Sequence, residues 1–133
     1  MIASGGMSTY REIVLEHFRH PRNRGPLTAA NVSVEGANPL CGDRVRIELR
    51  VVDETIADAG FTADACVLCV ASASLLTEYA RGMRTADART LNDAIAFNLV
   101  GGNVPRPRER CATLPLDTLR RAVIDFDEGH RGR

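Results

Sequence analysis

The 133-residue sequence contains no lysine, so its basic side chains are arginines and three histidines. Without lysine the chain cannot form a Schiff base with pyridoxal phosphate, and it cannot supply the lysine of a phosphate-binding P-loop. These two large classes of enzyme chemistry are therefore excluded for this chain unless a partner supplies the missing group.

The sequence also lacks an excess of charge and a long apolar run. Basic and acidic residues number 17 each, which gives no electrostatic basis for binding nucleic acid or an anionic membrane surface. No segment approaches the roughly 18 apolar residues of a membrane-spanning helix. The first six residues have neither the charged nor the apolar region of a signal peptide. We therefore expect a cytoplasmic protein that binds neither nucleic acid nor membranes.

Internal repeats, low-complexity tracts and linkers are absent as well. The length fits one domain that is large enough to bury an ordinary core. We expect residues 1–7 to be a disordered leader, residues 8–127 to form the domain and residues 128–133 to be a polar tail.

Periodicity predicts an α+β fold. Arg44–Val51 alternates strictly between charged and apolar residues, as in a strand with one buried and one exposed face. Weaker strand patterns lie at 31–35 and 56–61, and helical patterns at 10–20, 70–81, 90–100 and 116–126, with Pro115 suited to the first turn of the last helix. Strands in the first half and helices in the second predict a small antiparallel sheet of about three strands packed against helices.

Four cysteines, Cys41, Cys66, Cys69 and Cys111, carry the functional signal. Nothing indicates secretion, and cytosolic thiols stay reduced, so metal binding or catalysis is favoured over a disulfide framework. For any one cysteine the alternative is a small buried packing residue. Three of them, however, lie on predicted loops beside the end of an element, from which they can converge.

The settings of these three cysteines favour a site for a soft metal. Cys41 stands between a proline and a glycine just before the strong strand, and Asp43 adds an oxygen ligand two residues on. Cys66 follows the third strand pattern, and Cys111 precedes the last helix pattern. Both would lie near a helix N-terminus, where the helix dipole lowers the pKa of a thiol.

Cys69 is treated separately because Cys66-Val67-Leu68-Cys69 has the spacing of a redox-active Cys-x-x-Cys pair. A thioredoxin fold needs a βαβ unit, whereas the strands before Cys66 are predicted to be antiparallel. We therefore expect Cys69 to be a packing residue in the first turn of the following helix, facing the sheet, and not a metal ligand.

Together these motifs resemble the NifU/IscU/SufU family of iron–sulfur cluster assembly scaffolds, over nearly the whole chain from Ser8 to about Phe126. The resemblance rests on Asn-Pro-Leu-Cys-Gly-Asp at 38–43, Ala-Cys at 65–66 with Ala-Ser-Ala-Ser at 71–74, Arg-Cys at 110–111, and His-Pro-Arg-Asn-Arg-Gly at 20–25. It implies a SufE/NifU-like fold in which Cys41, Asp43, Cys66 and Cys111 form one site. It further implies a scaffold rather than an enzyme, holding a transient [2Fe–2S] cluster or a zinc ion.

The resemblance also implies partners and leaves the branch of the family open. A cysteine desulfurase would supply sulfur as persulfide, and apo iron–sulfur proteins would accept the cluster. Arg110 and the following Cys-Ala-Thr-Leu-Pro-Leu are SufU-like, whereas the short interval between Cys66 and Cys111 is IscU-like. The functional alternative is therefore a zinc-containing sulfurtransferase in which Cys111 leaves the metal to accept persulfide sulfur. A purely structural zinc site is a third possibility.

Two further hypotheses concern charge. Arg44 and Arg110, next to two proposed ligands, could offset the negative charge of several thiolates, or could be ordinary surface residues. Asp43 is a harder ligand than a thiolate, so we expect it to keep a bound cluster labile. The structural alternative is that Asp43 only caps its turn.

Overall fold

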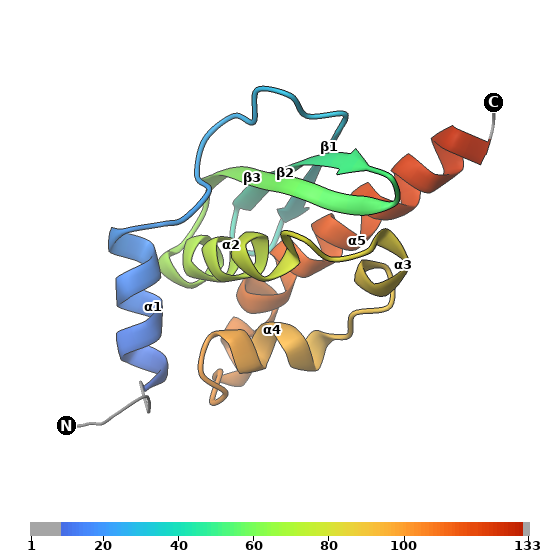
Figure 1. Ribbon diagram of the computed structural model, residues 1–133. Helices are drawn as coiled ribbons and strands as arrows, with labels where there is room; N and C mark the ends of the chain where they lie inside the picture. Colours follow the sequence, from blue (N-terminus) through green and yellow to red (C-terminus); the bar gives the residue numbers. More distant parts are fainter. Residues whose placement is uncertain (1–8, 132–133) are drawn as a thin grey trace.

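The structure, a computed structural model, describes residues 9–131. Three antiparallel strands form one sheet in the order β1-β2-β3, with helices on one side of it (Figure 1). The elements are, in chain order, α1 (Tyr10–Arg19), β1 (Val32–Asn38), β2 (Asp43–Val52), β3 (Thr55–Asp64), α2 (Val67–Ala80), α3 (Thr85–Ala88), α4 (Asp93–Leu99), a short 3-10 turn η1 (Arg106–Arg108) and α5 (Glu109–Arg131). The predicted α+β class with a three-stranded antiparallel sheet is confirmed.

β2 is the central strand, and its alternating sequence explains this position. Val45, Ile47, Leu49 and Val51 are buried on the helical side of the sheet, while the arginines of the strand point to the other face. The β2–β3 hairpin turns at Asp53 and Glu54, which both have positive φ angles, 51° and 60°. Two consecutive residues in this conformation make the type I′ turn that suits the twist of paired strands.

The core lies between the sheet and two helices. α2 packs on β3 and α5 packs on β1 and β2, while α1 covers α2 and α4 lies against α5 (Figure 1). The largest fully buried side chains are Phe61, Ile47, Leu49, Ile56, Leu68, Leu76, Leu116, Leu119, Val45, Val70, Val100 and Val123. This packing fixes the ends of the strands relative to the first turns of α2 and α5.

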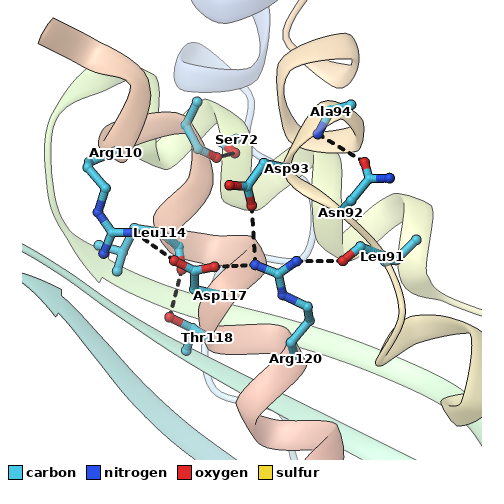
Figure 2. Close-up of polar contacts among 11 residues, drawn as sticks. Ser72, Leu91, Asn92, Asp93, Ala94, Arg110, Leu114, Asp117, Thr118 and Arg120 are labelled. Carbon is cyan, nitrogen blue, oxygen red and sulfur yellow. Dashed lines mark hydrogen bonds and ion pairs between the residues drawn. The ribbon is translucent and has the colours of Figure 1, made fainter. Parts of the chain in front are cut away.

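Two helices begin earlier than their sequence patterns predict. α2 starts at Val67 instead of residue 70, because Cys66 serves as its N-cap. α5 starts at Glu109, so that Pro115 lies inside the helix and not in its first turn. Pro115 has no N–H for the carbonyl four residues earlier. That carbonyl belongs to Cys111. In the same turn of the helix, the carbonyl of Ala112 accepts a hydrogen bond of 2.6 Å from the Ser72 hydroxyl, which joins α5 to α2 (Figure 2).

The predicted leader at residues 1–7 lies outside the described residues, so its disorder stays a prediction. Residues 128–131, assigned to the polar tail, continue α5 as far as Arg131. Among residues 9–131, no helix combines the length and apolar character needed to cross a membrane.

Candidate metal centre

Cys41 lies in the four-residue loop that joins β1 to β2. Asn38 and Asp43 pair at the base of this loop, and the backbone N–H groups of Cys41 and Gly42 donate to the Asn38 carbonyl at 3.2 and 2.9 Å. Gly42 has a φ of +75°, which glycine adopts without a steric penalty. The loop is therefore a tight turn that leaves Cys41 exposed.

Asp43, the first residue of β2, is the carboxylate of the predicted site. It is only 3% exposed. Its Oδ2 accepts a hydrogen bond from the Cys41 thiol at 3.3 Å, and its Oδ1 accepts one from the backbone N–H of Cys66 at 2.9 Å. Asp43 thus connects the β1–β2 loop to the start of α2. The backbone of the turn is capped by the Asn38 side chain, because its Oδ1 accepts a hydrogen bond from the Leu40 N–H at 3.2 Å.

Cys66 follows β3 and caps α2. Its Sγ accepts a hydrogen bond from the Cys69 backbone N–H at 3.5 Å, the role that a Ser, Thr or Asp oxygen has at most helix N-termini. The side chain is partly buried. The helix N-terminus that the sequence predicted beside this thiol is therefore present.

Cys111 lies in the first turn of α5 and reaches the loop that carries Cys41. The ligand atoms of Cys41, Asp43 and Cys111 all lie within 4.8 Å of one another. In residues 9–131 this is the one group of three or more such side chains that could hold a metal ion. Cys66 stands outside that set of three, although its side chain is near enough to Cys111 to affect the pKa of that thiol.

The pKa of the Cys111 thiol is raised, contrary to the expectation that a helix N-terminus lowers it. Burial is the largest cause, because a buried thiolate loses its hydration, and the neighbouring Cys66 and Asp43 add to the shift. The sequence placed this cysteine just before α5 and could not reveal its acidic neighbours. Without metal, Cys111 is held as a thiol, and a metal ion that binds there has to displace the proton.

Cys69 lies in the core of the protein. It is 0% exposed and packs in the main hydrophobic cluster. Its pKa is raised, first by burial and then by the charges of Asp43 and the other cysteines. This position agrees with a packing role.

Arg110 is engaged with a carboxylate. Its guanidinium donates to Asp117 at 2.7 Å, and Asp117 also pairs with Arg120, which in turn contacts Asp93 (Figure 2). This network joins α5 to the start of α4. Arg44 is exposed on β2 and, because side chains alternate along a strand, points to the opposite face from Asp43.

The histidines contribute nothing to the cluster in the described part of the chain. His17 is buried between α1 and α2, where its Nδ1 is 2.8 Å from the Ser74 hydroxyl. Its pKa is lowered, mainly by burial and then by the charge of Arg22. His20 is exposed, and the side chain of His130 lies outside the described residues.

The donor atoms fit zinc or an iron–sulfide core. Ligand atoms around a tetrahedral zinc ion are about 3.8 Å apart, given a ~2.3 Å Zn–S bond, so three donor atoms that lie within 4.8 Å of one another are close enough to bind one ion after a small shift. A sulfur-rich set favours soft metals over magnesium or calcium. Three thiols and a carboxylate would supply four ligands, the usual number for tetrahedral zinc.

One contact of the site was not predicted from the sequence. The Asn38 side-chain amide donates a hydrogen bond of 2.9 Å to Cys41 Sγ. The available signal was an asparagine three residues before a cysteine, but asparagine is common in turns for other reasons.

Comparisons with a family model and with known proteins point to the same family. Residues 9–131 match the model of the NifU-like N-terminal domain. The chain is 36% identical over 118 residues to the iron–sulfur cluster assembly scaffold protein IscU 1 of Archaeoglobus fulgidus, an alignment that covers 88% of this chain and 76% of that protein. It is 28% identical over 138 residues to the zinc-dependent sulfurtransferase SufU of Bacillus subtilis, covering 91% and 93% of the two chains.

Solved structures share the fold at lower identity. A NifU-like protein (N-terminal) from Brucella abortus superposes with a TM-score of 0.75 at 21% identity, covering 90% of this chain and 94% of that one. A putative SUF-system scaffold protein from Fervidobacterium islandicum superposes with a TM-score of 0.73 at 22% identity, covering 84% and 94%. These likenesses support the fold alone.

Proposed function

The chain belongs to the NifU-like N-terminal domain family, and from this membership we propose that it is a scaffold for iron–sulfur cluster assembly. In this proposal a cysteine desulfurase supplies persulfide sulfur, an external electron donor reduces it to sulfide, and a [2Fe–2S] cluster forms with added iron on Cys41, Asp43, Cys66 and Cys111. The finished cluster then passes to apo iron–sulfur proteins.

The observation that carries the proposal is the convergence of three distant segments. Cys41 and Asp43 come from the β1–β2 connection, Cys66 from the cap of α2 and Cys111 from the start of α5. Hydrogen bonds already join Asp43 to the Cys41 thiol and to the Cys66 backbone. This partial organisation of sulfur and carboxylate groups before any metal binds supports the proposal.

Access to the site supports exchange with protein partners. Cys41 is exposed, and the neighbouring Leu40 is 93% exposed. In the sulfur-transfer step, a thiolate of the site would attack the outer sulfur of the desulfurase persulfide. A new S–S bond forms, the donor's own S–S bond breaks, and the donor cysteine leaves as a thiolate.

The carboxylate of Asp43 favours a protein that delivers its cluster over one that retains it. Electron carriers usually hold clusters with four cysteines. A carboxylate is a harder ligand and is less well matched to an iron–sulfide core. We expect it to close the site and then to yield to a thiol of the acceptor protein.

The test is anaerobic purification and reconstitution of wild type and Cys111→Ser. Iron, acid-labile sulfide and zinc are measured, and the visible spectrum is recorded. A scaffold is expected to hold iron and sulfide in equal amounts with visible absorption that the substitution removes. A wild type that stays colourless and free of sulfide after reconstitution would contradict the proposal.

The second candidate is a zinc-dependent sulfurtransferase, and the similarity to SufU along 93% of that protein favours it. Here zinc would be held by the same four side chains, and Cys111 would leave the metal to accept sulfur. About one zinc per chain without sulfide, together with a desulfurase-dependent persulfide on Cys111 detected by mass spectrometry, would favour this function.

A further inference from the structure

We propose that Asn38 is a positioning residue of the metal centre, and that its side-chain amide holds and tunes the sulfur of Cys41 through an N–H···S hydrogen bond. The inference deepens the proposed function, since it assumes that Cys41 is a ligand. It assigns a role to a residue outside the predicted ligand set.

Asn38 is buried and uses both ends of its side-chain amide. It is 6% exposed. Its Nδ2 lies 2.9 Å from Cys41 Sγ and its Oδ1 lies 3.2 Å from the Leu40 backbone nitrogen. A buried amide that satisfies both of its polar atoms in this way has a defined orientation.

The orientation of this amide follows from its partners. The Leu40 N–H can only donate, so the atom facing it must be the oxygen. The NH₂ group must then face Cys41 Sγ. The opposite orientation would place two donors against each other at Leu40 and leave the sulfur without a donor. The N–H···S contact is therefore the arrangement that satisfies the turn.

This contact persists when the sulfur becomes a metal ligand. Without metal, the Cys41 thiol donates its proton to Asp43 Oδ2 at 3.3 Å. Metal binding replaces that proton and frees the Asp43 oxygen. The Asn38 amide needs no proton of Cys41, because it donates to a lone pair of the sulfur. Of the two side-chain bonds that Cys41 makes within residues 9–131, it is the one that is available both with and without metal.

Two consequences are expected for metal binding. Hydrogen bonds from outer residues orient ligands and commonly change metal affinity by about 10–100-fold. They also withdraw electron density from the sulfur and so change the electronic transitions and reduction potential of the metal centre. A residue that only shaped the turn would leave those electronic properties unchanged.

The chain offers a matched control at the other end of β1. Asn31 also uses both amide atoms, donating to the Val51 carbonyl at 2.8 Å and accepting from the Val51 N–H at 2.9 Å. Its partners are backbone groups and none is a cysteine. Replacing Asn31 therefore measures the cost of losing a paired asparagine at the edge of the sheet.

The experiment compares wild type, Asn38→Ser and Asn31→Ser. Serine at 38 can still accept from the Leu40 N–H, as hydroxyls do in turns, but it is too short to reach the sulfur. Zinc affinity is measured by competition with a chromophoric chelator, and bound cobalt(II) reports thiolate-to-metal charge transfer. Circular dichroism and urea unfolding check the metal-free fold.

We expect Asn38→Ser to bind zinc at least about tenfold more weakly and to shift the cobalt charge-transfer band. Asn31→Ser should lower stability to urea while zinc affinity and the cobalt spectrum stay unchanged. If Asn38→Ser does not fold, Asn38→Thr is measured instead. Its hydroxyl can accept from the Leu40 N–H, its β-branched side chain suits a strand, and it has no amide donor for the sulfur, so the same weakening and spectral shift are expected.

Equal zinc affinity and an unchanged cobalt spectrum in the folded Asn38 variant would overturn the inference alone. A wild type that binds neither zinc, cobalt nor a cluster would overturn the proposed function together with it. Equal losses in the Asn31 and Asn38 variants would also overturn the inference, because the effect would then belong to the sheet edge.

Discussion

The candidate metal centre and the interface between α5 and β1 are built differently. At the interface, a Cβ added to Gly36 would lie 2.1 Å from Thr118 Oγ1 and 3.3 Å from Leu114 Cδ1, so the backbone of β1 packs directly on the helix. At the candidate metal centre, the Asn38 amide donates to Cys41 Sγ and the Cys41 thiol donates to Asp43, so hydrogen bonds hold side chains at the ends of elements. Changes at the interface should therefore affect folding stability, and changes at the centre should affect ligand binding.

Cys66 and Cys69, three residues apart, give the largest expected contrast between the candidate centre and the packed interior. Cys66→Ala is expected to abolish stable metal binding while the metal-free fold is retained. Cys69→Ala should leave the metal content unchanged and lower the free energy of unfolding by about 1 kcal/mol, because it removes a fully buried sulfur from the core. Metal analysis and urea unfolding of the metal-free proteins are the measurements. Equal metal loss from both substitutions would revive the Cys-x-x-Cys alternative.

Gly36→Ala tests the interface. The added methyl group overlaps the Thr118 hydroxyl, so the metal-free protein should lose about 1–3 kcal/mol of stability through overpacking. Urea unfolding followed by circular dichroism measures this loss. Gly129→Ala, on α5 with open space around it, is the matched control and should be neutral or slightly stabilising. A Gly36 variant as stable as wild type would show that β1 and α5 are not so closely packed.

Asp43→Cys tests whether the carboxylate keeps the centre labile. Both proteins are loaded with cluster anaerobically, and its loss to apo-ferredoxin is followed by visible spectroscopy. Transfer should be slower from the four-cysteine variant, because thiolate suits an iron–sulfide core better than carboxylate does. Identical rates, with both clusters intact at the start, would mean that Asp43 does not control release.

The smallest expected effect is the pH dependence that His17 contributes away from the centre. Its pKa is lowered in the folded protein, so the unfolded chain binds the proton more readily, with a pKa near 6.5. This contribution to stability is complete above about pH 6.5 and is lost as the pH falls toward the folded pKa. His17→Asn keeps a polar group near Ser74 and does not titrate. Between pH 7.5 and 5.5, wild type should lose more stability to urea than this variant, by at most about 1 kcal/mol. Parallel losses would assign the pH dependence to other groups.

Several parts of the fold were predictable because local chemistry decides them. The alternation of charged and apolar residues in β2 determines which face of the strand is buried, and it does so independently of which helix packs on that face. The Thr9–Glu12 capping box starts α1, with the Thr9 hydroxyl accepting from the Glu12 N–H at 3.2 Å. The loop around Cys41 was also predictable, since proline, glycine and asparagine restrict the backbone within a few residues.

Helix α5 was predicted less well because its start depends on its surroundings. Pro115 suggested a helix beginning there, as proline is common in first turns. The observed helix begins six residues earlier, at Glu109, and packs on β1, β2 and α2. This earlier start places Cys111 inside the first turn and buries it, which is why its pKa is raised.

The sequence by itself determined which chemistry is available: no lysine, four cysteines, and an aspartate two residues after the first of them. It also determined the turn that carries Cys41 and the strand that ends before Cys66. Only the tertiary structure decided that Cys111 reaches Cys41 and Asp43, that Cys69 is buried in the core and that the Asn38 amide faces a sulfur. The physical reason is distance along the chain: turns and caps depend on neighbours a few residues away, whereas these contacts depend on how the helices pack on the sheet.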